Sequence, residues 1–169
     1  KVKDPHCQFV HISIPSGYGV ERIGNAPQFY KRVNPKAKKQ SFDFKLTKVD
    51  QSVYSVLALG DPHLTDVYSK RADHRGTSIY KEKVIPAINE YAAQCKHPVY
   101  MVTLGDMTQT STRPGWKGRE AGYSFKNYME DTKVDIPVFN AIGNHDHNHA
   151  PKGEMFNDET VYLSRADYH

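Results

Sequence analysis

The sequence has no apolar run that approaches the roughly 20 residues needed to cross a bilayer, so we expect no membrane span. It has only two cysteines, Cys7 and Cys95, and their spacing is not that of a metal-binding pair. Cys95 falls on the apolar face of an expected helix, where we predict a buried thiol. The stretch from Lys1 to Pro5 contains no hydrophobic signal core. With 38% apolar and 25% charged residues, the composition is that of a globular chain.

The excess of positive charge is small over the whole chain but concentrated in one segment. The formal net charge is +4, whereas residues 31–48 contain seven cationic side chains. These are Lys31, Arg32, Lys36, Lys38, Lys39, Lys45 and Lys48, opposed only by Asp43 and the neighbouring Asp50. We interpret the segment as a solvated face, with contact to a nucleic acid or another anionic surface as the alternative.

Residues 1–50 have the pattern of a small β-rich segment. Residues 9–14 and 42–46 have strand character, and "FDFKL" alternates apolar and polar residues as a half-buried strand does. The pieces "PSGYG" and "VNPKAKKQ" are loops by their proline, glycine and lysine content. We therefore predict a β-sandwich-like domain, or part of one, over these residues.

Residues 51–169 have the pattern of an α/β domain. Strands are predicted at residues 53–59, 99–104 and 136–142, and helices at 77–95 and 119–133. The first strand is a nearly continuous apolar run, which is typical of a strand covered on both faces. Pro86 lies inside the first helix, so the helix either kinks there or has its regular part begin at the proline. The resulting βαβαβ order predicts a parallel sheet.

Each of the three predicted strands ends in a glycine followed by side chains that can bind a metal ion. The ends read "LGDPH", "LGDM" and "IGNHD". They contribute Asp61 and His63, then Asp106, and then Asn144, His145 and Asp146. In an open parallel sheet, ligand sites form just beyond the carboxyl ends of the strands. We therefore predict one site at this edge.

Simpler roles are open for each of these residues taken alone. Asp61 and Asp106 could cap the helices that follow them, and His63 could be a hydrogen-bonded core histidine. If the backbone stays extended, however, residues two apart point to the same side, which suits Asp61 and His63 as ligands of one ion. Asn144 alone would be an ordinary turn residue. The stretch "IGNHDHNHA" alone would be an exposed histidine-rich loop.

The motifs "GDPH", "GDM" and "GNHD" together resemble those of the calcineurin-like metallophosphoesterases, over residues 53–149. The resemblance implies an αββα sandwich, of which this chain would contain a partial sheet, and a phosphate-ester substrate. The stretches "FVHISIPSGYGV" and "QFYKR" are similar to a β-sandwich segment that precedes this domain in a bacterial branch of the family. That second likeness implies a periplasmic or secreted protein.

The resemblance also implies a role for each matching residue. Asp61 and His63 would bind the first of two divalent ions (Mn, Fe or Zn), Asp106 would bridge the two, and Asn144 would bind the second. His145 would contact the phosphate and protonate the leaving oxygen, with Asp146 orienting it. His147 and His149 match no role in the family, and we expect them in a solvent-exposed loop.

The chain departs from the family pattern after His149. The family continues with a lone histidine and a Gly-His-x-His element, whereas only His169 follows in this chain. The chain would then be either a fragment of a longer enzyme or a degenerate relative. Because the motifs present are intact, we expect a fragment that lacks the C-terminal half of its domain and is inactive by itself. The predicted function is metal-dependent hydrolysis of phosphate esters. The alternatives are a noncatalytic binding or scaffold module, and a nuclease or phosphodiesterase of the same fold.

Overall fold

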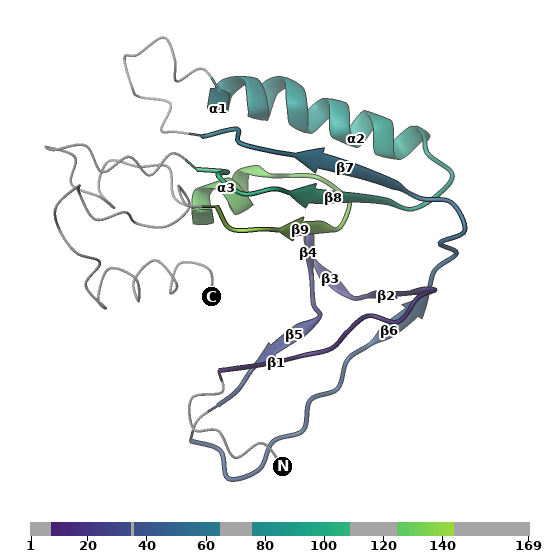
Figure 1. Cartoon of the computed structure of the whole chain (residues 1–169), viewed down its shortest axis with the longest axis vertical. Coiled ribbons are helices and arrows are strands. Elements are labelled where there is room, and N and C mark those ends of the chain that lie inside the picture. Colours follow the sequence, from purple (N-terminus) through teal and green to yellow (C-terminus); the bar gives the residue numbers. More distant parts are fainter. Residues whose placement is uncertain (1–7, 35, 65–75, 109–124, 144–169) are drawn as a thin grey trace, which may run out of the picture.

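The computed structural model describes residues 8–34, 36–64, 76–108 and 125–143, and comprises a β-rich N-terminal segment followed by an α/β unit (Figure 1). The strands of the N-terminal segment are β1 (Phe9–His11), β2 (Tyr18–Val20), β3 (Arg22–Ile23), β4 (Ala26–Pro27), β5 (Tyr30–Arg32) and β6 (Leu46–Lys48). Within the described parts of the chain, no helix has both the length and the apolar character that a bilayer span requires.

The N-terminal strands form three antiparallel pairs, β1 with β5, β2 with β6 and β3 with β4. The β-rich character predicted for this segment is confirmed, and the β-sandwich stays a prediction. The strand predicted at residues 42–46 is wrong, because β6 begins only at Leu46. Phe44 instead packs its ring under the Lys31 amine, 5.4 Å from the ring centroid. Its partial burial therefore comes from a side-chain contact and not from a strand ladder.

The α/β unit contains a three-stranded parallel sheet in the order β7-β8-β9, as the strand and helix pattern predicts. Its elements are β7 (Ser55–Leu59), α1 (Gly76–Ile79), η2 (Tyr80–Val84), α2 (Ile85–Gln94), β8 (Val99–Thr103), α3 (Phe125–Asp131) and β9 (Val138–Asn140). The predicted α/β class is thus confirmed at this level, with shorter strands than expected. The helix predicted at residues 119–133 ends at Asp131, and residues 119–124 of that prediction lie outside the described residues.

The helix predicted at residues 77–95 is present as the continuous run α1, η2 and α2. Pro86 lies in the first turn of α2, so the regular part of the helix does begin at the proline. Just before it, η2 is π-helical, and the Ile85 N–H donates to the Tyr80 carbonyl five residues earlier. Because proline has no N–H to donate, a wider turn at this point disturbs few helical hydrogen bonds.

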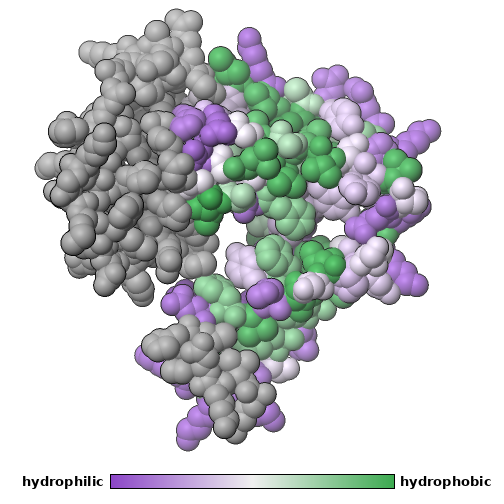
Figure 2. All heavy atoms as spheres, in the orientation of Figure 1, coloured by the Kyte–Doolittle hydropathy of each residue, from purple (hydrophilic) through white to green (hydrophobic). Residues whose placement is uncertain are grey.

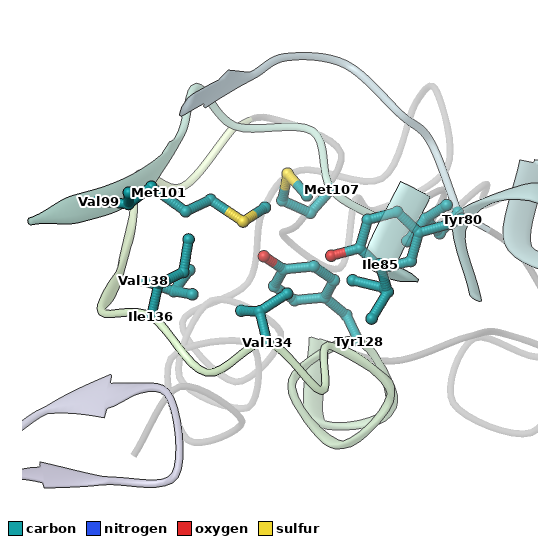
Figure 3. Packing of buried hydrophobic residues seen from close by; sticks show 10 residues of the cluster. Tyr80, Ile85, Val99, Met101, Met107, Tyr128, Val134, Ile136 and Val138 are labelled. Carbon is teal, nitrogen blue, oxygen red and sulfur yellow. The ribbon is translucent and has the colours of Figure 1, made fainter. Parts of the chain in front are cut away.

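One face of the sheet packs against the helices and forms the core. On β8, Val99, Met101 and Thr103 are buried, while the alternate residues are only half-buried. Figure 3 shows Met101 and Val138 from the strands directed toward Tyr128 of α3. The core consists of Leu64, Tyr80, Ile85, Val99, Met101, Met107, Tyr128, Val134, Ile136 and Val138. Burial raises the pKa of the Tyr80 phenol above its ordinary value, so this hydroxyl keeps its proton throughout the neutral range.

The described residues leave much of the opposite face of the sheet uncovered, so the burial on both faces that was predicted for residues 53–59 is not found in this part of the chain. Val56 is 50% exposed, and Leu104 and Ile142, just beyond β8 and β9, are 63% and 48% exposed. Figure 2 shows hydrophobic residues gathered across the region of β7, β8 and β9. The described N-terminal segment reaches only part of this face, where the Phe29 and Phe139 rings stack 6.2 Å apart. The apolar run therefore supplies two apolar faces, of which the described residues cover one.

The N-terminal segment is held to the α/β unit by a buried asparagine. Asn25, in the turn between β3 and β4, is 8% exposed and donates from its side chain to the Thr132 carbonyl. Its own carbonyl accepts from the Val138 N–H at 2.9 Å. Nearby, Arg22 pairs with Asp135 at 3.3 Å. Because these bonds link residues more than one hundred positions apart, Asn25 joins the two parts of the fold.

We predict that Asn25→Ala lowers the free energy of unfolding by about 1–3 kcal/mol, because it leaves the buried Thr132 carbonyl without this donor. Asn34→Ala is the matched control, since Asn34 is exposed and its side chain bonds only within its own loop. Urea denaturation of the two variants measures the difference. Equal stabilities would show that Asn25 does not hold the two parts together.

Candidate metal centre

The pairing of β7 with β8 continues beyond the ends of both strands. The Leu104 N–H donates to the Leu59 carbonyl at 2.8 Å, and the His63 N–H donates to the Asp106 carbonyl at 3.1 Å. One residue further, the Leu64 N–H donates to the Met107 carbonyl at 2.9 Å. The two segments that leave the sheet therefore run side by side, as the parallel strands do.

Three of the predicted ligands meet where these two segments lie together. Asp61, His63 and Asp106 each offer one ligand atom, and these atoms all lie within 4.8 Å of one another. The His63 Nε2 is 3.7 Å from the Asp61 Oδ1. Asp61 is exposed, whereas His63 and Asp106 are half-buried. The sequence prediction that two separate strand ends bring these residues together is thus seen in the structure.

The cluster has a donor set and a size that fit one divalent ion. Metal bonds to imidazole nitrogen and carboxylate oxygen are about 2.0–2.2 Å long, so two ligands of one ion lie within about 4.4 Å of each other. The 3.7 Å separation of Asp61 and His63 meets this condition. Two ligand atoms as far apart as the 4.8 Å limit of the cluster would have to move closer by a few tenths of an ångström to bind one ion. Mixed imidazole and carboxylate ligands suit Mn, Fe or Zn better than Ca.

The backbone at all three residues adopts the left-handed conformation. The φ angles of Asp61, His63 and Asp106 are 48°, 45° and 52°, and no other described residue apart from glycine has a positive φ. The backbone from Asp61 to His63 is therefore not extended, contrary to the condition on which we expected the two side chains to share one side. The two side chains nevertheless converge. A left-handed residue with a side chain is strained, and such strain is concentrated at functional sites.

The third strand approaches the cluster through a glycine. A Cβ added at Gly143, three residues beyond β9, would overlap the Oδ1 and the backbone nitrogen of Asp106. A Cβ at Gly105 would come within 2.8 Å of the Gly143 Cα. Only glycines allow the two chains to approach this closely. The sequence places a glycine at each of the three strand ends, but it does not predict that Gly143 packs on Asp106.

The remaining predicted site residues follow directly after Gly143. Asn144, His145 and Asp146, and also His147 and His149, lie outside the described residues. Their predicted roles as metal ligand, acid, orienting residue and loop therefore stay predictions.

The cationic segment lies on a different part of the chain from the cluster. All seven of its lysine and arginine side chains are exposed, on β5, on β6 and on the connection between them. Figure 1 shows β5 and β6 below the three-stranded sheet, whereas the cluster follows β7 and β8. Comparisons of the chain with protein-family models, with curated proteins and with solved structures gave no significant match. The resemblance to the metallophosphoesterases therefore rests on the sequence motifs and stays a prediction.

We predict that Gly143→Ala weakens Mn²⁺ binding by about 10-fold or more, because the new methyl group displaces the Asp106 carboxylate. Gly60→Ala is the matched control. A Cβ at Gly60 would make only ordinary contacts, 3.7 Å from Leu104. The Gly60→Ala variant should therefore bind Mn²⁺ with the affinity of the wild type. Isothermal titration calorimetry measures the Mn²⁺ affinity of both variants. Equal affinities in the two variants would refute the close packing of Gly143 on Asp106.

The strained backbone leads to a prediction about stability. In metal-free protein, His63→Gly should be more stable than His63→Ala by about 1 kcal/mol, because glycine adopts the left-handed conformation without steric cost. At an unstrained position the order is reversed, since glycine loses more entropy on folding. Thermal unfolding of the two variants measures the difference. A more stable His63→Ala would contradict the left-handed geometry.

Proposed function

We propose that this chain belongs to a metal-dependent phosphoesterase of the calcineurin-like type. The observation that carries the proposal is the meeting of Asp61, His63 and Asp106 at the carboxyl edge of a parallel sheet. Ligand sites in open parallel sheets form at this edge. The three residues belong to the motifs "GDPH" and "GDM", which resemble those of the family. The αββα sandwich and a periplasmic or secreted location are parts of the same proposal.

The arrangement supports a definite division of roles. When bound, two divalent ions would polarise the phosphoryl group and make hydroxide available at neutral pH. Asp61 and His63 would hold the first ion. Asp106 would reach both ions, since its carboxylate lies near the other two ligands and also contacts the chain at Gly143. Asn144, the residue after Gly143, would hold the second.

The proton for the leaving group comes from the third strand end in this proposal. His145 would contact the phosphate and protonate the leaving oxygen, and Asp146 would orient its imidazole. An imidazole suits this task because its ordinary pKa lies near neutral pH, so it can release and regain a proton there. The close approach of Gly143 to Asp106 supports it, because His145 follows only two residues later.

The activity is tested in the longest natural form of the protein that contains residues 1–169. With Mn²⁺ present we expect hydrolysis of an aryl phosphate, and we expect Asp106→Asn to lower turnover by about 100-fold or more. Asp43→Asn is the matched control, because Asp43 is exposed in the N-terminal segment and should leave turnover unchanged. Turnover that survives Asp106→Asn, or that is absent from the wild type at every metal concentration, would refute the proposal.

A nuclease of the same fold is the second candidate. The seven exposed cationic side chains of residues 31–48 favour contact with nucleic acid, but they lie away from the cluster and so support this function less than a phosphoesterase. The same preparation, tested with single-stranded DNA and with an aryl phosphodiester, separates the two functions. Contacts of these side chains with phosphates would make DNA affinity fall steeply with salt. A noncatalytic scaffold would keep its binding partner after both Asp61→Asn and Asp106→Asn.

A further inference from the structure

Asn140, the last residue of β9, connects three elements of the α/β unit through its side chain. Its amide oxygen accepts from the Thr103 hydroxyl at 3.2 Å and from the Tyr128 hydroxyl at 3.1 Å. Its amide nitrogen lies 3.4 Å from the Met129 sulfur, to which it donates. Thr103 ends β8, and Tyr128 and Met129 belong to α3. One carboxamide therefore holds the ends of two strands and a helix.

The donors to Asn140 are themselves fixed in the core. Thr103 and Tyr128 are both 0% exposed. The Tyr128 carbonyl accepts from the Thr132 hydroxyl at 2.7 Å, and this hydroxyl is 2.8 Å from that of Tyr80. Figure 3 shows Tyr128 extending from α3 with its hydroxyl toward the strand that carries Met101. A buried network of this kind holds its members in one arrangement.

The hydrogen bonds of the Asn140 side chain lie at the point where β8 and β9 leave the sheet. Asn140 is the register partner of Thr103, and the Ala141 N–H donates to the Thr103 carbonyl at 3.1 Å. Three residues beyond Thr103 lies Asp106, and three residues beyond Asn140 lies Gly143. These two residues then meet, with no room for a side chain at Gly143. The relative position of the two strand ends thus determines how Gly143 packs on Asp106.

We propose that Asn140 is a positioning residue of the metal centre. By accepting from Thr103 and Tyr128, it fixes the exit of β9 relative to that of β8, and so holds Gly143 against the Asp106 carboxylate. The catalytic consequence rests on the proposed function. The geometric part does not, because it concerns only how the segment at Asp106 is held.

Two variants separate this role from general stability. Asn140→Leu removes the acceptor while keeping a similar side-chain volume. Asn140→Asp keeps an oxygen that accepts from both hydroxyls. Asn89→Leu is the matched control, because the Asn89 side chain also bridges two elements, donating to the Lys133 carbonyl and accepting from the Asp135 N–H. These bonds lie before β9 begins, at the opposite end of the strand from the cluster.

The first measurement uses metal-free protein. The His63 N–H donates to the Asp106 carbonyl, so its hydrogen exchange reports whether the Asp106 segment stays in place. We expect Asn140→Leu to speed exchange at His63 by about 10-fold or more relative to Asn89→Leu, at matched global stability. Asn140→Asp should exchange at the wild-type rate. If Asn140→Leu unfolds the protein, Tyr128→Phe replaces it and should show the same selective effect in smaller degree.

The second measurement is the Mn²⁺ affinity of the same variants, which we expect to fall by about 10-fold or more in Asn140→Leu and to be retained in Asn89→Leu and Asn140→Asp. Equal exchange at His63 in the Asn140 and Asn89 variants would overturn the inference. A wild type that binds no Mn²⁺ would overturn the proposed function instead, while the exchange comparison would still decide the role of Asn140.

Discussion

The site depends on one physical constraint, the continued parallel pairing of two strands past the ends of the sheet. Backbone hydrogen bonds between the segments after β7 and β8 keep them together as far as Leu64 and Met107. Both of these side chains are buried, at 1% and 0% exposure, so the paired segments are attached to the core. The candidate ligands Asp61, His63 and Asp106 lie between the sheet and Leu64 and Met107. They are therefore held by backbone bonds and core packing on either side.

The strain at the cluster is compatible with a stable fold because it is confined to this short stretch. Each left-handed residue with a side chain costs up to about 1–2 kcal/mol, and the hydrogen bonds and buried residues on both sides offset it. A site built in this way is formed before an ion arrives, so little binding energy is lost in ordering it. The glycines serve the same end, since Gly105 and Gly143 let a third segment approach the carboxylate of Asp106.

The sequence predicts the parallel sheet, its strand order along the chain, the helix that contains Pro86, and the convergence of Asp61, His63 and Asp106. These features follow from the periodicity of the hydrophobic residues, from the apolar runs and from the position of potential ligands directly after strands, all of which are local signals. It does not predict the open second face of β7, because an apolar residue such as Val56 looks the same whether or not another layer covers it. Nor does it predict the left-handed backbone at His63 or the hydrogen bond between Asn140 and Thr103, because the partners Asp106 and Thr103 lie more than thirty positions away in the sequence.

We propose that a divalent ion binds between the segments after β7 and β8, and not in the histidine-rich stretch that follows Gly143. Paramagnetic broadening by substoichiometric Mn²⁺ in backbone amide NMR spectra locates the ion directly. We expect the amides of Asp61, His63, Asp106 and Gly143 to broaden first. Broadening that is confined to residues 145–149, with those four amides unchanged, would contradict it.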